Sequence, residues 1–182
     1  MAVHVTDQIF ELFRQCGSLT YGEDATQLQH ALQVAELARR NQCSDAMIAA
    51  GLLHDVGQFM DDAGNAAETL GIDARHEVQG AAFLAKFFPQ AVSEPVRLHV
   101  AAKRYLCAID PGYLNGLSRA SAISLALQGG PMSAAEIAAF EAEPFFADAV
   151  TLRHFDDMGK QPDWHVSDLA SYRPLLESLR TA

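Results

Sequence analysis

Apolar residues recur every three or four positions along most of the chain, and this spacing predicts amphipathic helices. The clearest helix begins after Asp24 or Thr26, either of which is a suitable N-cap. Its buried face is expected to carry Leu28, Leu32, Ala35 and Leu37. No segment alternates apolar and polar residues convincingly in the manner of a strand. The pattern therefore predicts an all-α fold.

Capping residues, glycines and prolines divide the rest of the chain into further helices. Gly57 and Pro89 are expected to end two of them, and Ser133 with Glu136 forms a capping box for another. No repeat or linker is visible, so residues 1–182 are expected to form one domain. Beyond the helix described above, we expect helices over 6–13, 45–56, 76–88, 93–106, 118–127, from 133, 145–155 and 168–179, with a loop at 58–75.

Composition and charge narrow the function. The net charge of −10 disfavours nucleic acid and anionic membranes as partners, and a small anionic substrate would need a locally positive pocket. No apolar stretch approaches the roughly 20 residues that cross a bilayer, and the first residues do not resemble a secretory signal. Three cysteines without C-x-x-C spacing indicate a reducing compartment, so a cytoplasmic protein is expected.

Candidate chemistry centres on His54 and Asp55, which directly follow the apolar run at 49–53. An unpaired buried charge costs several kcal/mol, and a metal ion removes that cost. His30, His76 and His99 also lie on or beside apolar helical faces. A single partly buried histidine is more often a hydrogen-bonded core residue, but four on separate helices beside a carboxylate favour a metal cluster. Imidazole and carboxylate together suit iron, manganese or zinc; surface positions are expected for His4, His154 and His165.

The order His30, His54-Asp55 and Asp156 resembles the H…HD…D pattern of the HD-domain superfamily. The further histidines resemble its binuclear subset, which implies an HD-type helical bundle around two metal ions. By this resemblance one metal is held by His30, His54 and Asp156, with Asp157 as the alternative to Asp156. The other metal is held by His76 and His99, and Asp55 bridges the two.

Four longer strings resemble one branch of that superfamily more closely. They are Tyr21-Gly22-Glu23 with the segment 27–33, His99 to Leu106, Gln128-Gly129-Gly130-Pro131-Met132, and Leu152-Arg153-His154-Phe155-Asp156. Together they resemble the HD-domain mixed-valence diiron oxygenases that cleave carbon–phosphorus bonds in hydroxylated aminoethylphosphonates, relatives of myo-inositol oxygenase. The resemblance implies two iron ions as Fe(II)/Fe(III) and O2 as co-substrate. The implied substrate is 1-hydroxy-2-aminoethylphosphonate or its trimethylammonio analogue, converted to inorganic phosphate and glycine or glycine betaine.

Spacing supports an anion site beside the metals. Lys103 lies four residues after His99 and shares its helix face, so its ammonium suits a phosphonate oxygen. Arg153 precedes Asp156 by three residues and adds a bidentate cation. The resemblance adds Ser121 and Ser124 as phosphonate ligands. Arg104 lies about 100° round the helix from Lys103 and is expected to face solvent or a carboxylate.

The resemblance also assigns the segment before His30 to substrate recognition. It implies that Glu23 meets the substrate amine. In the family a tyrosine of this segment occupies an iron position until substrate arrives, and Tyr21 stands at or within one residue of that position in the sequence. Many members carry a histidine where this chain has Gln58, which cannot carry charge. We therefore expect Gln58 to alter the amine end of the pocket in favour of an N-methylated amine. A quaternary ammonium would need an aromatic face, and the candidates are Tyr21, Phe59 and Tyr105.

Two other functions fit parts of the pattern. Most HD-domain proteins are phosphohydrolases, in which the metals activate water against a phosphate ester without O2. A non-catalytic HD module that binds metal or ligand for regulation is the third possibility. Dependence of phosphate release on O2 separates the first two, and any turnover after iron loading excludes the third.

Overall fold

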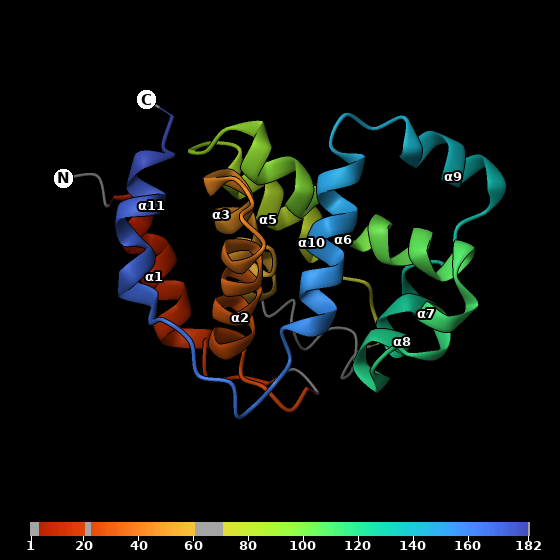
Figure 1. Cartoon of the computed structure of the whole chain (residues 1–182), viewed down its shortest axis with the longest axis horizontal. Coiled ribbons are helices and arrows are strands. Elements are labelled where there is room, and N and C mark those ends of the chain that lie inside the picture. The colour runs from red at the N-terminus through yellow and green to blue at the C-terminus, as the bar shows by residue number, and fades with distance from the viewer. Residues whose placement is uncertain (1–3, 21–22, 61–70, 182) are drawn as a thin grey trace.

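The computed structural model describes residues 4–20, 23–60 and 71–181, and every regular element in these ranges is a helix. The all-α prediction is therefore confirmed. The 3-10 turns are η1 (Val56–Phe59) and η3 (Leu169–Tyr172). The α-helices are α1 (Val5–Cys16), α2 (Gln27–Arg40), α3 (Asp45–Leu53), α5 (His76–Leu84), α6 (Gln90–Ile109), α7 (Pro111–Asn115), α8 (Arg119–Leu127), α9 (Ala134–Glu141), α10 (Phe146–Met158) and α11 (Arg173–Ser178) (Figure 1).

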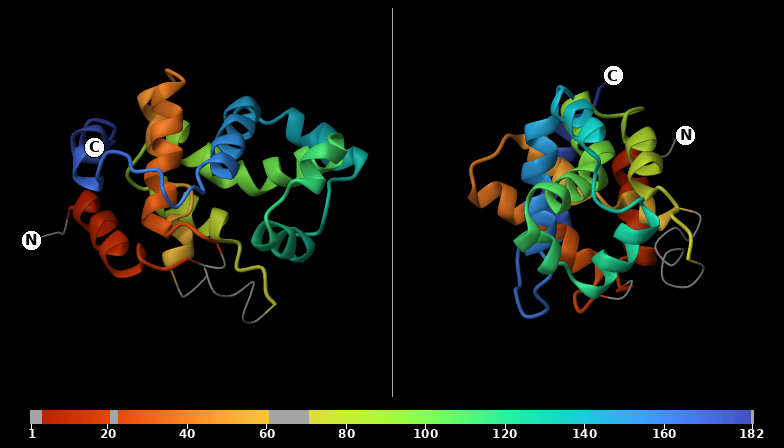
Figure 2. Two further views of the ribbon diagram at one scale, coloured as in Figure 1. Left: turned by 60° about the horizontal axis from the view of Figure 1, so that its bottom comes forward. Right: turned by 90° about the vertical axis from the view of Figure 1, so that its right-hand side faces the viewer.

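The helices form a bundle whose middle is α2, α3, α5, α6 and α10 (Figure 1). Helices α1 and α11 lie at one end of the molecule, and Figure 2 shows α7, α8 and α9 at the other. The largest apolar core joins the first end to the middle, while a smaller cluster that includes Tyr105 and Phe140 lies between α6 and α9. Helix α6 runs through both clusters and therefore connects the two halves. No helix within the described ranges combines the length and apolarity that a membrane span requires.

Several helix starts agree with the predicted caps. Thr26 caps α2, and its hydroxyl accepts a hydrogen bond from the Gln29 backbone N–H at 3.2 Å. Ser44 caps α3, and Ser133 forms the expected box with Glu136. These caps satisfy backbone N–H groups that lack partners in the first helical turn, so they are encoded within four residues of sequence.

Other boundaries differ from the prediction. Helix α5 ends at Leu84 rather than Phe88, and α6 begins at Gln90 rather than Ser93. Pro95 lies inside α6, near its start. Helix α6 ends at Ile109 rather than at residue 106, and the carboxylate of the next residue, Asp110, accepts hydrogen bonds from two backbone N–H groups and starts the short helix α7. The last predicted helix is divided into η3 and α11 because Pro174, at the start of α11, has no N–H to donate.

Helix α3 was predicted to continue to Val56, but it ends at Leu53. Asp55 has φ −102° and ψ 8°, outside the α-helical region, and η1 follows. Adjacent residues on a helix point about 100° apart. Ending the helix here allows His54 and Asp55 to face the same space, which a continuous helix would prevent.

Gly57 fixes the distance between this turn and α5. A Cβ atom at Gly57 would lie 1.9 Å from the carbonyl oxygen of His76 and 2.8 Å from the backbone nitrogen of Gly80. Only a residue without a side chain permits this approach of the two backbones. Gly57 therefore sets the position of His76 relative to His54 and Asp55.

We expect Gly57→Ala to lower the free energy of unfolding by at least about 2 kcal/mol, because neither backbone can move without disturbing the core. Urea unfolding in metal-free buffer would measure this. Gly116→Ala is the matched control, since its added Cβ would meet no atom closer than 3.4 Å, and its effect should stay within about 0.5 kcal/mol. Equal stability of the two variants would contradict the role given to Gly57.

Candidate metal centre

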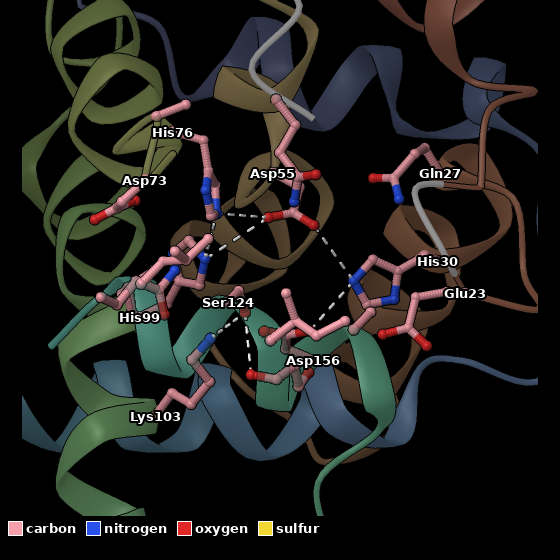
Figure 3. A pocket seen from close by; sticks show the side chains of 18 of the residues that line it. Glu23, Gln27, His30, Asp55, Asp73, His76, His99, Lys103, Ser124 and Asp156 are labelled. Carbon is pink, nitrogen blue, oxygen red and sulfur yellow. Dashed lines mark hydrogen bonds and ion pairs between the residues drawn. The ribbon is translucent and has the colours of Figure 1, made fainter. Parts of the chain in front are cut away.

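One group of ligands combines α2, the end of α3 and α10. The Nε2 atoms of His30 and His54 lie 3.1 Å apart. Asp156 Oδ1 lies 3.3 Å from His30 Nε2 and 3.8 Å from His54 Nε2. Asp55 Oδ2 lies 3.7 Å from His30 Nε2 (Figure 3) and 3.5 Å from His54 Nε2. Four donor atoms therefore converge on one point.

A second group lies on the other side of Asp55. His76, the first residue of α5, and His99, in α6, have their Nε2 atoms 3.2 Å apart. Asp55 Oδ1 lies 3.3 Å from the first and 3.7 Å from the second (Figure 3). Each oxygen of Asp55 thus belongs to a different group. The structure brings all six predicted ligands together, and the bridging position expected for Asp55 agrees with its geometry.

Backbone carbonyl groups orient three of the four imidazoles. His30 Nδ1 lies 2.7 Å from the Gly159 oxygen, His54 Nδ1 2.8 Å from the Gly51 oxygen and His99 Nδ1 2.7 Å from the Val96 oxygen. A carbonyl only accepts, so Nδ1 donates, and in the neutral ring Nε2 presents a bare lone pair. These lone pairs point at one another and at carboxylate oxygens. Such an arrangement suits a cation between them, so the residues fit metal ions.

The charges of the site support this fit. Burial disfavours the charged form of His54, but Asp55 and Asp156 outweigh it and raise the pKa of His54 to about 9. Burial, together with the charges of His76 and His54, lowers the pKa of His99 to about 3. Burial opposes ionisation of Asp55 and Asp156, yet nearby histidines, and for Asp156 chiefly Arg153, hold both pKa values well below the usual range. The buried carboxylates thus remain anionic and attract a cation or a proton.

Arg153 holds Asp156 in place. Its Nη1 donates to Asp156 Oδ2 at 2.7 Å, which leaves Oδ1 for the first ligand group. Its other nitrogens donate to Asp157 and to the Tyr113 hydroxyl, and Tyr113 donates to Asp157 Oδ2 at 2.5 Å. Of the two candidate carboxylates, Asp156 therefore faces His30 and His54, and Asp157 positions Arg153. Sequence spacing did not indicate the contribution of Tyr113.

A cavity of about 1020 Å³, including its open mouth, lies against both ligand groups. Lys103 is buried, and its ammonium donates to Ser124 Oγ at 2.8 Å (Figure 3). Burial and the nearby Arg153 lower the pKa of Lys103 to about 8. The cavity is lined by the described residues predicted to bind substrate: Glu23, Gln58, Lys103, Ser121, Ser124 and Arg153.

Lys160 is a cavity residue that the sequence analysis missed. Its ammonium donates to Glu23 Oε1 at 2.9 Å and to Ser121 Oγ at 3.3 Å. The Ser118 hydroxyl donates to the same Glu23 oxygen at 2.8 Å. Lys160 directly follows Gly159, whose carbonyl orients His30. This contact joins residues 129 positions apart, so no local pattern indicated Lys160.

The aromatic residues expected to face a substrate ammonium are not found in the described lining of the cavity. Phe59 packs edge-on against Phe13 in the core, and the Tyr105 hydroxyl donates to Glu141 on the side of α9. Neither aromatic ring lines the cavity, so neither supplies the expected face for an ammonium. Tyr21 lies outside the described residues. Arg104 pairs with Glu136 at 2.7 Å, as expected; of the three histidines expected at the surface, His154 and His165 are exposed and His4 is half-buried.

Comparison with known proteins agrees with this geometry. Residues 28–179 match the HD domain family. The chain is 49% identical over 171 residues to hydroxymethylphosphonate dioxygenase of Gimesia maris, covering 93% of this chain and 85% of that protein. It is 40% identical over 177 residues to the glycine-betaine-forming 1-hydroxy-2-(trimethylamino)ethylphosphonate dioxygenase of Leisingera caerulea, covering 97% and 90%. The chain belongs to the HD-domain family and, within it, to the dioxygenase group that includes these two relatives.

We expect the wild-type protein to bind two metal ions per chain, measured by mass spectrometry of the metals after desalting. His76→Ala should retain one, because the first ligand group stays intact. Asp55→Ala should bind less than one, because both groups lose an oxygen. His165→Ala, at an exposed histidine, is the control and should retain two. A single ion in the wild-type protein would be incompatible with the shared carboxylate.

Proposed function

We propose that this enzyme is an O2-dependent oxygenase that cleaves the carbon–phosphorus bond of a 1-hydroxyalkylphosphonate. This class includes 1-hydroxy-2-aminoethylphosphonate and its trimethylammonio analogue, as the sequence suggests, and also hydroxymethylphosphonate. The observation that carries the proposal is a buried lysine and two serines beside paired metal-ligand groups that share one carboxylate. We further propose that residues 1–182 act as one domain in the cytoplasm.

The metal ions in the proposal are iron, held by His30, His54, Asp55 and Asp156 on one side and by Asp55, His76 and His99 on the other. When bound as an Fe(II)/Fe(III) pair, they would supply the redox chemistry with O2. In the products C1 is a carboxylate and phosphorus is inorganic phosphate. This four-electron oxidation balances the four-electron reduction of one O2.

The protein side chains bind and orient the substrate. Lys103 and Ser124, which already contact each other, would bind phosphonate oxygens, and Ser121 lies on the same face of α8. Arg153 would add positive charge while it holds Asp156. Glu23 and Gln58 would contact the substituent on C1. Tyr21 would have the gating role that the family resemblance implies. This binding would fix C1 close to the ligand groups, and the fixed orientation would increase the rate of the reaction.

Dependence on O2 tests the proposal against the phosphohydrolase alternative. With the iron-loaded enzyme and the three substrates named above, we expect one O2 consumed for each phosphate released. Removal of O2 should abolish phosphate release and readmission should restore it. An oxygen electrode with a phosphate assay measures both quantities. Undiminished phosphate release without O2 would support a hydrolase instead.

Lys103 gives the reaction a specific pH dependence. It binds the phosphonate as a cation, and its pKa of about 8 means that this charge is present below pH 8 and lost above it. We therefore expect kcat/KM to fall as pH rises through 8. Lys103→Met should lower kcat/KM at pH 7 by about 30-fold or more, since it removes a buried charged partner, and should remove this alkaline decline. Lys103→Arg should move the decline to higher pH, because arginine keeps its charge; an identical profile in both variants would assign the decline to another group.

A further inference from the structure

The part of the cavity next to His30 contains an ion pair that joins two distant segments. Glu23 precedes α2 and Lys160 follows α10, 137 positions later in the chain. Both side chains are largely buried, with 21% and 18% of their surface exposed. In Figure 3, Glu23 lies beside His30, while Lys103 lies on the side of His99. Glu23 therefore lines the part of the cavity away from Lys103, and the Lys160 ammonium lies between Glu23 and Ser121, to whose hydroxyl it donates at 3.3 Å.

The contacts of Glu23 determine what this end can recognise. The Lys160 ammonium and the Ser118 hydroxyl both donate to Glu23 Oε1, at 2.9 Å and 2.8 Å. The carboxylate charge is thus balanced by a lysine of the protein itself. The nearby charges of Asp156 and Glu23 outweigh burial and raise the pKa of Lys160, so this lysine stays a cation. A substrate ammonium that approached Glu23 would meet a like charge within a few ångströms, which is unfavourable in a partly buried site.

The described residues of the lining do not supply the usual partner for a quaternary ammonium group. Quaternary ammonium groups are commonly recognised by aromatic faces. None of the described residues that line the cavity is a phenylalanine, tyrosine or tryptophan. Asp73, another carboxylate of the lining, lies close to His76 in Figure 3, on the opposite side from Glu23.

We propose that Lys160 is a specificity-determining residue: it occupies Glu23 and so makes the enzyme prefer a 1-hydroxyalkylphosphonate without an ammonium group on its substituent. This inference rests on the proposed function and names the substrate class within it. Hydroxymethylphosphonate has the required chemistry. A substrate with an ammonium must displace Lys160 from Glu23 before it can use that carboxylate.

Binding measured without turnover tests this assignment. The probes are methylphosphonate and 2-aminoethylphosphonate, which lack the C1 hydroxyl and differ chiefly in the aminomethyl group that carries the ammonium. Calorimetric titration of the iron-loaded enzyme under argon gives the ratio of their Kd values. We expect the wild-type enzyme to bind methylphosphonate at least as tightly as 2-aminoethylphosphonate. Lys160→Met should shift the ratio toward 2-aminoethylphosphonate by about tenfold, the effect of one hydrogen bond to a charged group.

Three variants serve as controls. Lys160→Arg keeps the cation and should keep the wild-type ratio, and Lys86→Met, at an exposed lysine, should do the same. The double variant Glu23→Gln with Lys160→Met should lose the tenfold shift, because the carboxylate that would receive the ammonium is gone. Because both probes carry the phosphonate group, a general loss of phosphonate affinity cancels in the ratio of their Kd values.

The results separate this inference from the proposed function. An unchanged ratio in Lys160→Met, or a wild-type enzyme that binds 2-aminoethylphosphonate more tightly than methylphosphonate, would overturn the role of Lys160. Turnover of hydroxymethylphosphonate, 1-hydroxy-2-aminoethylphosphonate and its trimethylammonio analogue is measured in parallel with O2 uptake. If no O2 is consumed while the Kd ratio shifts as expected, the oxygenase proposal fails and the assignment of Lys160 stands.

Discussion

The carboxylate of Asp55 is the group on which the rest of the site depends. Each of its oxygens faces a different pair of imidazoles, at distances of 3.3 to 3.7 Å. One carboxylate can do this only if four histidines from separate parts of the chain converge on it. Helices α2, α3, α5 and α6 meet at this point, and the end of α3 at Leu53 turns Asp55 toward all of them. The packing of the central helices therefore determines the geometry of the candidate metal centre.

The cavity beside this centre is lined by cations that differ in whether a carboxylate neutralises them. The protein carries a net charge of −10, yet three cations line the cavity, namely Lys103, Arg153 and Lys160. Two of them have carboxylate partners in the structure, Asp156 for Arg153 and Glu23 for Lys160. Lys103 instead contacts the neutral hydroxyl of Ser124, and burial lowers its pKa. The locally positive wall that an anionic substrate requires is therefore concentrated at Lys103, which explains why this end is assigned to the phosphonate.

Much of the fold could be predicted because its signals are local. The caps at Thr26, Ser44 and Ser133 each act within four residues, and apolar periodicity identified the major α-helices except the short α7. The errors occur where distant contacts decide. The end of α3 was misplaced because its geometry depends on the close approach of Gly57 to α5. Such an approach leaves no trace in the periodicity of either segment.

The sequence by itself predicted which side chains would hold a metal, because buried histidines and carboxylates on separate helices suit a cation, and the order of those residues resembles a known family. It also determined that Lys103 shares a helix face with His99. Only the tertiary structure decided that Asp156 rather than Asp157 faces the histidines of the first ligand group, since Arg153 and Tyr113 hold the second carboxylate elsewhere. It likewise revealed the pairing of Glu23 with Lys160. Helical spacing is fixed by local backbone geometry, whereas an ion pair across 137 residues depends on how the helices pack.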